Sequence, residues 1–77
     1  MENLIGRNCR ITFQRKNSQW TTFDVLDVRG DLVLLRGIAG DGYASKSTFW
    51  QALASIDTVH PLGPAIGERH SPKTEDN

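Results

Sequence analysis

The stretch "WTTFDVLDV", residues 20–28, decides the fold because its apolar residues change sides halfway along. Phe23 and Val25 fall on one face of an extended strand, whereas Leu26 and Val28 fall on the other. A flat strand cannot bury both pairs in one core. A β-bulge or a sharp bend between the two pairs can, because one extra residue resets the register and increases the twist. The pattern therefore predicts a strongly bent second strand in a small β-structure.

Residues 6–15, which precede that stretch, alternate apolar and polar side chains with the period of two that is typical of a half-buried strand. The apolar face of this first strand consists of Cys9, Ile11 and Phe13. The opposite, polar face consists of Arg10, Thr12, Gln14 and Lys16. Residues 16–19 are polar and favour a turn, so we expect them to connect the first strand to the second.

Further strands and turns are predicted after residue 28. Gly30 indicates a tight turn within Arg29–Asp31, because glycine adopts positive φ at little cost. The apolar segment "LVLLRG", residues 32–37, predicts a third strand that is buried on both faces or covered by something outside the sheet. Residues 38–42 contain two glycines and an Asp-Gly pair, which favour a hairpin. Residues 43–47, "YASKS", then predict a short fourth strand.

A change of period follows the fourth strand. Thr48 and Gln51 fit the capping-box pattern that begins many helices. Three apolar residues have the i, i+4, i+7 spacing of one helix face: Phe49, Leu53 and Ile56. We therefore expect one or two helical turns over residues 49–54.

The end of the chain is expected to contribute little to the core. Residues 58–59 suit a final short strand, which we expect Pro61 to end. Residues 61–77 hold all three prolines and few large apolar groups, so they bury too little surface to offset their ordering entropy. The sequence thus predicts one mainly β domain over residues 1–61, with one short helix before the last strand, and a flexible, disordered tail over residues 62–77.

Four bent antiparallel strands, a helical turn and a fifth short strand resemble the SH3-like small β-barrels. Within that group the chain is most similar to the Sm-like RNA-binding barrels, with "LVLLRG" as the third strand and "ALASIDTVHP", residues 52–61, at the end. The resemblance covers residues 5–61 and implies a five-stranded antiparallel SH3-like barrel. The N-terminal helix and the Lys-His pair of bacterial Sm-like proteins are missing from the pattern, so no RNA-contacting residue is carried over.

Residues that could support catalysis are few. Cys9 lies on the apolar side of the first strand, where a lone cysteine behaves as a small hydrophobic residue, and a single cysteine excludes an internal disulfide. His60 is expected at an exposed strand end and His70 in the tail. The carboxylate grouping of Asp24, Asp27 and Asp31 is expected to form a solvated polar face. We therefore predict no enzymatic activity, no cofactor and no metal site.

The sequence predicts a cytoplasmic protein that does not enter membranes. Its N-terminal residues lack the basic start and apolar run of a secretory signal. The longest apolar run, Leu32–Leu35, is far shorter than a membrane span.

The charges of this formally neutral chain are unevenly distributed, since no acid occurs between Asn3 and Phe23. The basic residues of that region form a candidate nucleic-acid face: Arg7, Arg10, Arg15 and Lys16. Such a face could neutralise phosphates of RNA or DNA. The overall charge balance is not that of a dedicated nucleic-acid binder, so this function is the alternative hypothesis.

The favoured hypothesis is a non-catalytic interaction module. Leu32–Leu35 and the pair Phe49-Trp50 offer more apolar surface than a domain of this size readily encloses. The remaining surface could bind a protein or peptide, or a second copy of the chain as a homo-oligomer. A candidate partner groove would be lined by Trp20, Tyr43 and Trp50.

Overall fold

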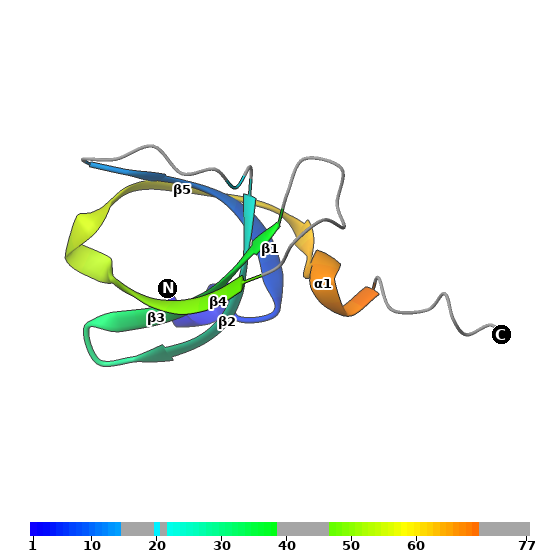
Figure 1. Ribbon diagram of the computed structural model, residues 1–77, viewed down its shortest axis with the longest axis horizontal. Coiled ribbons are helices and arrows are strands. Elements are labelled where there is room, and N and C mark those ends of the chain that lie inside the picture. The colour runs from blue at the N-terminus through cyan, green and yellow to red at the C-terminus, as the bar shows by residue number, and fades with distance from the viewer. Residues whose placement is uncertain (15–19, 21, 39–46, 70–77) are drawn as a thin grey trace, which may run out of the picture.

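The computed structural model describes residues 1–14, 20, 22–38 and 47–69 (Figure 1). Five strands dominate it: β1 (Arg7–Phe13), β2 (Thr22–Arg29), β3 (Leu32–Ile38), β4 (Ser47–Ala52) and β5 (Ile56–Pro64). Short helical segments complete it: the 3-10 turns η1 (Glu2–Leu4) and η2 (Leu53–Ser55), and the helix α1 (Ile66–Arg69).

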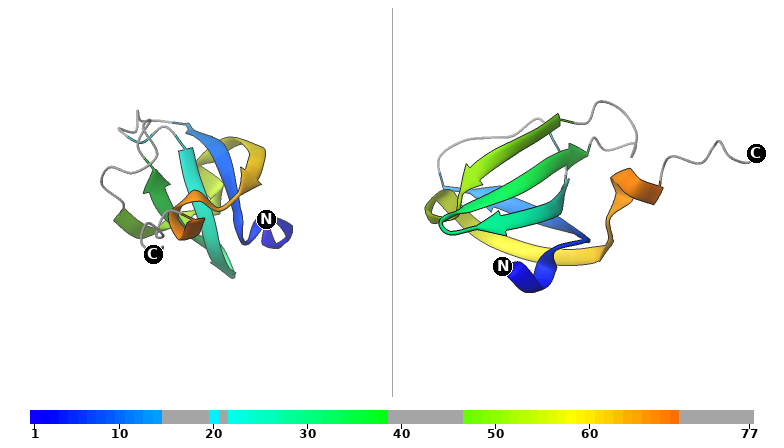
Figure 2. Two further views of the ribbon diagram at one scale, coloured as in Figure 1. Left: turned by 90° about the vertical axis from the view of Figure 1, so that its right-hand side faces the viewer. Right: turned by 90° about the horizontal axis from the view of Figure 1, so that it is seen from below.

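The strands form one antiparallel sheet in the order β4-β3-β2-β1-β5, which confirms a mainly β fold with five antiparallel strands. The sheet curls strongly, so that β5 lies across the interior from β3 and β4 (Figure 1). Within the described residues it does not close into a barrel. Figure 2 (right) shows β4, in light green, at one border of the sheet and β5, in yellow, at the other.

The bend predicted in β2 is confirmed. Its pairing with β3 shifts register between Val25 and Asp27, as a β-bulge requires. Val25 therefore lies fully buried before the shift, and Val28 packs against the same core after it. Leu26, which lies within the shift, is half-buried. The turn from β2 to β3 also has the expected geometry, with Gly30 at a φ of 56°.

The core lies on the concave side of the sheet. The alternation predicted for the first strand is confirmed there, since Cys9 and Ile11 are buried and Phe13 packs against them. Phe23 is central, with its ring centroid 5.6 Å from that of Phe13 and 6.0 Å from that of Phe49, both in edge-to-face geometry. The buried cluster consists of Cys9, Ile11, Phe23, Val25, Val33 and Leu35.

The helix predicted over residues 49–54 is wrong. Ser47–Ala52 is strand β4, and a single 3-10 turn, η2, precedes β5. The reason is the neighbouring strand: β3 pairs with the whole length of β4 and supplies the partners that helical hydrogen bonds would otherwise provide. The apolar spacing was nevertheless informative, because Phe49, Leu53 and Ile56 all pack against the core, each from a different element.

The fourth strand predicted over residues 43–47 lies outside the described residues except for Ser47, which begins β4. The turn expected over residues 16–19 also lies outside them, as does most of the hairpin expected over residues 38–42. η2 joins two parts of the sheet: the Leu53 N–H donates to the Asp31 carbonyl at 2.9 Å, and the Ser55 carbonyl accepts from the Gln14 N–H at 3.0 Å.

The prediction that Pro61 ends the last strand is wrong. β5 continues to Pro64, and Pro61 itself is paired with Cys9 of β1. An edge strand tolerates proline because half of its N–H groups have no neighbouring strand to bond. The described part of the chain extends through α1, past the boundary expected at residue 61, and residues 70–77 lie outside it.

Candidate functional site

An apolar surface lies on the convex side of β3 and β4. Residues paired across the two strands share a face, and Leu34 is paired with Trp50 and Leu32 with Ala52. The intervening β3 residues are buried in the core, so these four side chains point away from it. Leu32 is 42% exposed and Trp50 43% exposed, although both are large apolar residues. We call these four residues the outer patch.

A charged pair borders the outer patch. The guanidinium carbon of Arg29 lies 5.8 Å from the centroid of the Trp50 ring, within cation–π range. Arg29 Nε also lies 3.2 Å from Asp27 Oδ2. Both side chains are exposed, so the ion pair adds little stability. The ion pair holds the Arg29 guanidinium beside the Trp50 indole, and the outer patch itself stays apolar.

The outer patch adjoins an open sheet edge. Within the part of the chain that the structure describes, β4 pairs with one strand only, β3. Alternate N–H and C=O groups of β4 therefore point away from the sheet and are available to an added strand. Trp50 lies near the middle of β4, so apolar side chains and main-chain hydrogen-bonding groups are presented together.

The structure does not bring together Trp20 and Trp50, the two described residues of the predicted partner groove. Trp20 is half-buried, packs against the core cluster and covers Gly37, where a Cβ would lie 2.7 Å from Trp20 Cδ1. Trp50 lies on the opposite face of the sheet. Tyr43 lies outside the described residues. Of these two described tryptophans, Trp50 contributes to the outer patch and Trp20 does not.

The predicted basic face is described at two of its four positions. Arg7 and Arg10 are exposed on β1, whereas Arg15 and Lys16 lie outside the described residues. Arg10 is paired with His60 of β5, which is also exposed. The neighbouring hydroxyls of Thr12 and Thr58 lie 2.6 Å apart. The two described residues of the predicted basic face are therefore on β1, two strands or more away from the outer patch.

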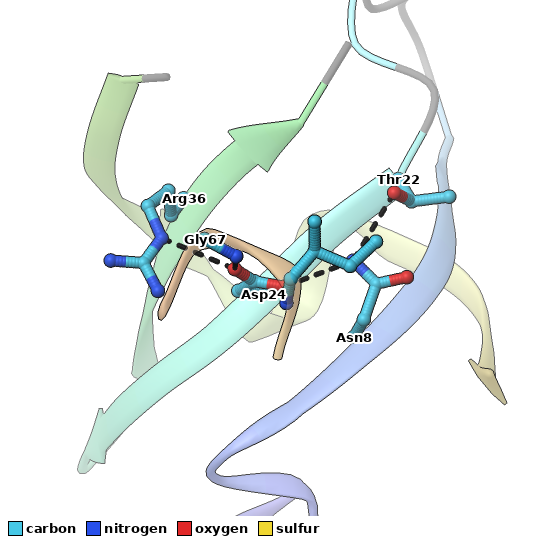
Figure 3. A network of polar contacts seen from close by, with 6 residues as sticks. Asn8, Thr22, Asp24, Arg36 and Gly67 are labelled. Atoms are coloured by element: carbon cyan, nitrogen blue, oxygen red, sulfur yellow. Dashed lines mark hydrogen bonds and ion pairs between the residues drawn. The ribbon is translucent and has the colours of Figure 1, made fainter. Parts of the chain in front are cut away.

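The solvated face expected for the carboxylates is wrong for Asp24, which is fully buried. Its Oδ1 accepts hydrogen bonds from Asn8 Nδ2 and the Ile66 N–H, both at 2.9 Å. Its Oδ2 accepts from the Gly67 N–H at 2.8 Å and from Arg36 Nε at 3.2 Å (Figure 3). Asp27 is partly exposed in its pair with Arg29.

These four donors determine the charge state of Asp24. Burial by itself raises the pKa of the carboxyl group, but the hydrogen bonds from Ile66, Asn8, Gly67 and Arg36 outweigh it and leave the pKa below its ordinary value of 3.8. The carboxylate is thus ionised and satisfied inside the fold. Sequence reasoning missed this role because no local pattern around Asp24 shows that residues 66–67 return to cover it.

The single cysteine of the chain, Cys9, belongs to the core cluster. Cys9 is fully buried, and burial raises the pKa of its thiol, an effect that Arg7 opposes and Asp24 reinforces.

Within residues 1–14, 20, 22–38 and 47–69, no group of three or more His, Cys, Asp or Glu side chains could hold a metal ion. None of the helices in these same ranges is long and apolar enough to cross a membrane.

No protein-family model matches this chain, and comparisons with curated proteins and with solved structures likewise find no match. A functional proposal therefore rests on the geometry of the residues themselves.

Proposed function

We propose that this chain is a non-catalytic interaction module that binds an extended polypeptide segment at the β4 edge, with the outer patch receiving its side chains. The observation that carries the proposal is the exposure of Trp50 and Leu32 beside the outer edge of β4, which pairs with β3 alone among the described strands. Binding by strand addition uses main-chain hydrogen bonds for affinity and neighbouring apolar side chains for specificity. Both components are present at β4.

The composition of β4 supports this role. Its sequence, STFWQA, contains no charged residue and no proline. Charged residues and proline are among the features with which proteins protect edge strands, because an unprotected edge pairs with other chains. An edge that lacks such protection favours a binding function over a purely structural one.

We further propose that the fold is a variant of the SH3-like small barrel. The strand order β4-β3-β2-β1-β5 and the 3-10 turn between the last two strands support this assignment. The bulge in β2 also supports it, because small barrels turn their corners at such bends. This fold accommodates many unrelated activities, so it adds nothing to the functional argument.

The proposal is tested with short random peptides displayed on phage and selected on the immobilised chain. We expect enriched peptides with alternating apolar residues, and we expect Trp50→Lys to lose their binding. Leu62→Lys is the matched control, because Leu62 is 46% exposed but lies on β5, at the other border of the sheet. Peptides that bind the Trp50→Lys variant as well as the original chain would overturn the proposal.

Nucleic-acid binding is retained as a second candidate because Arg7 and Arg10 are both exposed on β1. Fluorescence anisotropy with labelled single-stranded RNA and duplex DNA tests it. This function predicts an affinity that falls steeply with salt and is lost in Arg10→Glu. Arg29→Glu, the same charge reversal at an exposed site beside the outer patch, should leave it unchanged. An absence of binding at low salt would eliminate this candidate.

A further inference from the structure

We propose that the segment bound at the β4 edge is β4 of a second copy of this chain, which makes the protein an antiparallel twofold dimer with one continuous sheet. This inference rests on the proposed function and names its partner. It predicts that Trp50 lies at or near the twofold axis, with the outer patches of both copies on one face of the joined sheet.

The two borders of the sheet differ in their ability to accept a strand. β4 contains neither charge nor proline, whereas β5, with the sequence IDTVHPLGP, contains an aspartate and two prolines. Pro61 and Pro64 have no N–H groups to donate, so β5 is a poor template for an added strand. Pairing β4 of one copy with β5 of another would be a head-to-tail contact, which gives a ring or an open filament according to the rotation between copies. Pairing of β4 with β4 closes after two copies.

A register centred on Trp50 suits this pairing. In such a register Trp50 meets Trp50 of the partner copy, and Thr48 meets Ala52. All of these positions lie on the convex face, so the apolar patches of the two copies join without moving a core side chain to the surface. Phe49 and Gln51 meet on the other face. Cross-strand aromatic pairs stabilise antiparallel strands more than alanine pairs do.

Electrostatics do not oppose the association of identical copies. The chain carries nine basic and nine acidic residues, so its formal net charge is zero and two copies have no net repulsion at neutral pH. A strand without charged residues places no like charges opposite each other when it pairs with itself. The Arg29-Asp27 pair at the border of the patch is internally neutral. As the partner at the β4 edge, these features favour a second copy of the chain over a strongly charged peptide.

The inference is tested by sedimentation equilibrium of the full chain from about 1 μM to about 1 mM, a range that covers weak dimers. We expect a monomer–dimer equilibrium. Trp50→Lys should weaken dimerisation by at least about tenfold, since a charge at the axis faces its own copy. Leu62→Lys should leave the dissociation constant within about twofold, because β5 is outside the interface.

A second variant and further measurements distinguish a loss of dimerisation from a loss of folding. Thr48→Lys changes an exposed β4 residue on the same face as Trp50 and should also weaken dimerisation. Circular dichroism establishes that each variant is folded. Amide hydrogen exchange of the unmodified chain should show β4 protection that rises with protein concentration and β5 protection that does not.

Two outcomes would overturn the dimer. One is a monomer throughout the concentration range, and the other is a dimer that Leu62→Lys disrupts while Trp50→Lys and Thr48→Lys leave it intact. If peptides bind at the β4 edge of a chain that stays monomeric, the dimer is excluded and the proposed function stands. If neither peptides nor a second copy bind there, both proposals fail.

Discussion

The buried carboxylate of Asp24 accepts a hydrogen bond of 2.8 Å from the backbone N–H of Gly67, 43 residues further along the chain. This contact joins the middle of the sheet to the segment that follows the last strand (Figure 3). Asp24 also accepts from side chains of β1 and β3, so one carboxylate connects three strands and α1. The stability of the C-terminal part of the fold depends on it.

Replacing Asp24 by asparagine should lower the free energy of unfolding by about 3 kcal/mol, because the half-buried Arg36 loses its anion and an amide nitrogen then faces N–H donors. Urea denaturation monitored by circular dichroism measures this change. Asp27→Asn is the control, since the exposed Asp27–Arg29 pair contributes about 1 kcal/mol or less. Equal losses in the two variants would contradict the structural role of Asp24.

The lowered pKa of Asp24 predicts a specific loss of stability in acid. In the unfolded chain the carboxyl group takes up a proton near its ordinary pKa of 3.8, whereas in the folded chain it remains ionised to lower pH. Its contribution is therefore complete above pH 3.8 and disappears as the pH falls through the folded-state value. The difference in unfolding free energy between the original chain and Asp24→Asn should be constant near neutrality and shrink below about pH 4. A difference that is unchanged at low pH would show that the pKa is not lowered.

Alanine at position 67 should disturb the same network from the other side. A Cβ there would lie 2.6 Å from Cζ and 2.8 Å from Nη2 of Arg36, so the guanidinium that bonds Asp24 would have to shift. Crowding of this kind costs about 1–3 kcal/mol of unfolding free energy. Gly63→Ala is the control and should change stability by less than about 0.5 kcal/mol, because no atom lies within 4 Å of its added Cβ.

The double variant with Gly67→Ala and Asp24→Asn measures the energetic coupling between these two positions through its unfolding free energy. If both substitutions act through the Asp24–Arg36 contact, their combined effect should be smaller than the sum of the single effects. Additive losses would place the effect of Gly67→Ala elsewhere.

The Cys9 thiol should react slowly with Ellman's reagent in the folded protein. Its side chain has no exposed surface, and burial raises its pKa and so reduces the thiolate fraction. Labelling then requires local or global opening, and we expect a rate at least about 100-fold below that of the same thiol in denaturant. Rapid labelling under native conditions would show that the first strand is not packed as described.

Much of the strand pattern could be predicted because it depends on neighbouring residues. The period of two in β1 identified Cys9, Ile11 and Phe13 as its core side, although Asn8 on the other side is buried as well. The change of side within residues 20–28 located the bulge of β2. The spacing of Phe49, Leu53 and Ile56 identified three core residues but assigned them to a helix. The spacing of apolar residues indicates which side chains are buried. Whether the segment that carries them is a helix or a strand depends on whether a neighbouring strand is available to pair with it.

The candidate site was harder to predict. Trp50 was expected to contribute to a surface, but its grouping with Trp20 was wrong, because the two indoles lie on opposite faces of the sheet. Asp24 has the same local context as a solvent-exposed strand residue, between the buried residues Phe23 and Val25. Only the return of residues 66–67 covers it.

The sequence by itself determined the β class, the inward faces of β1 and β2 and the position of the bend, since these follow from side-chain alternation over a few residues. The tertiary structure decided which strands are borders of the sheet, which face Trp50 occupies and that Asp24 is buried. These properties arise from contacts between residues far apart along the chain, for which no local pattern carries information.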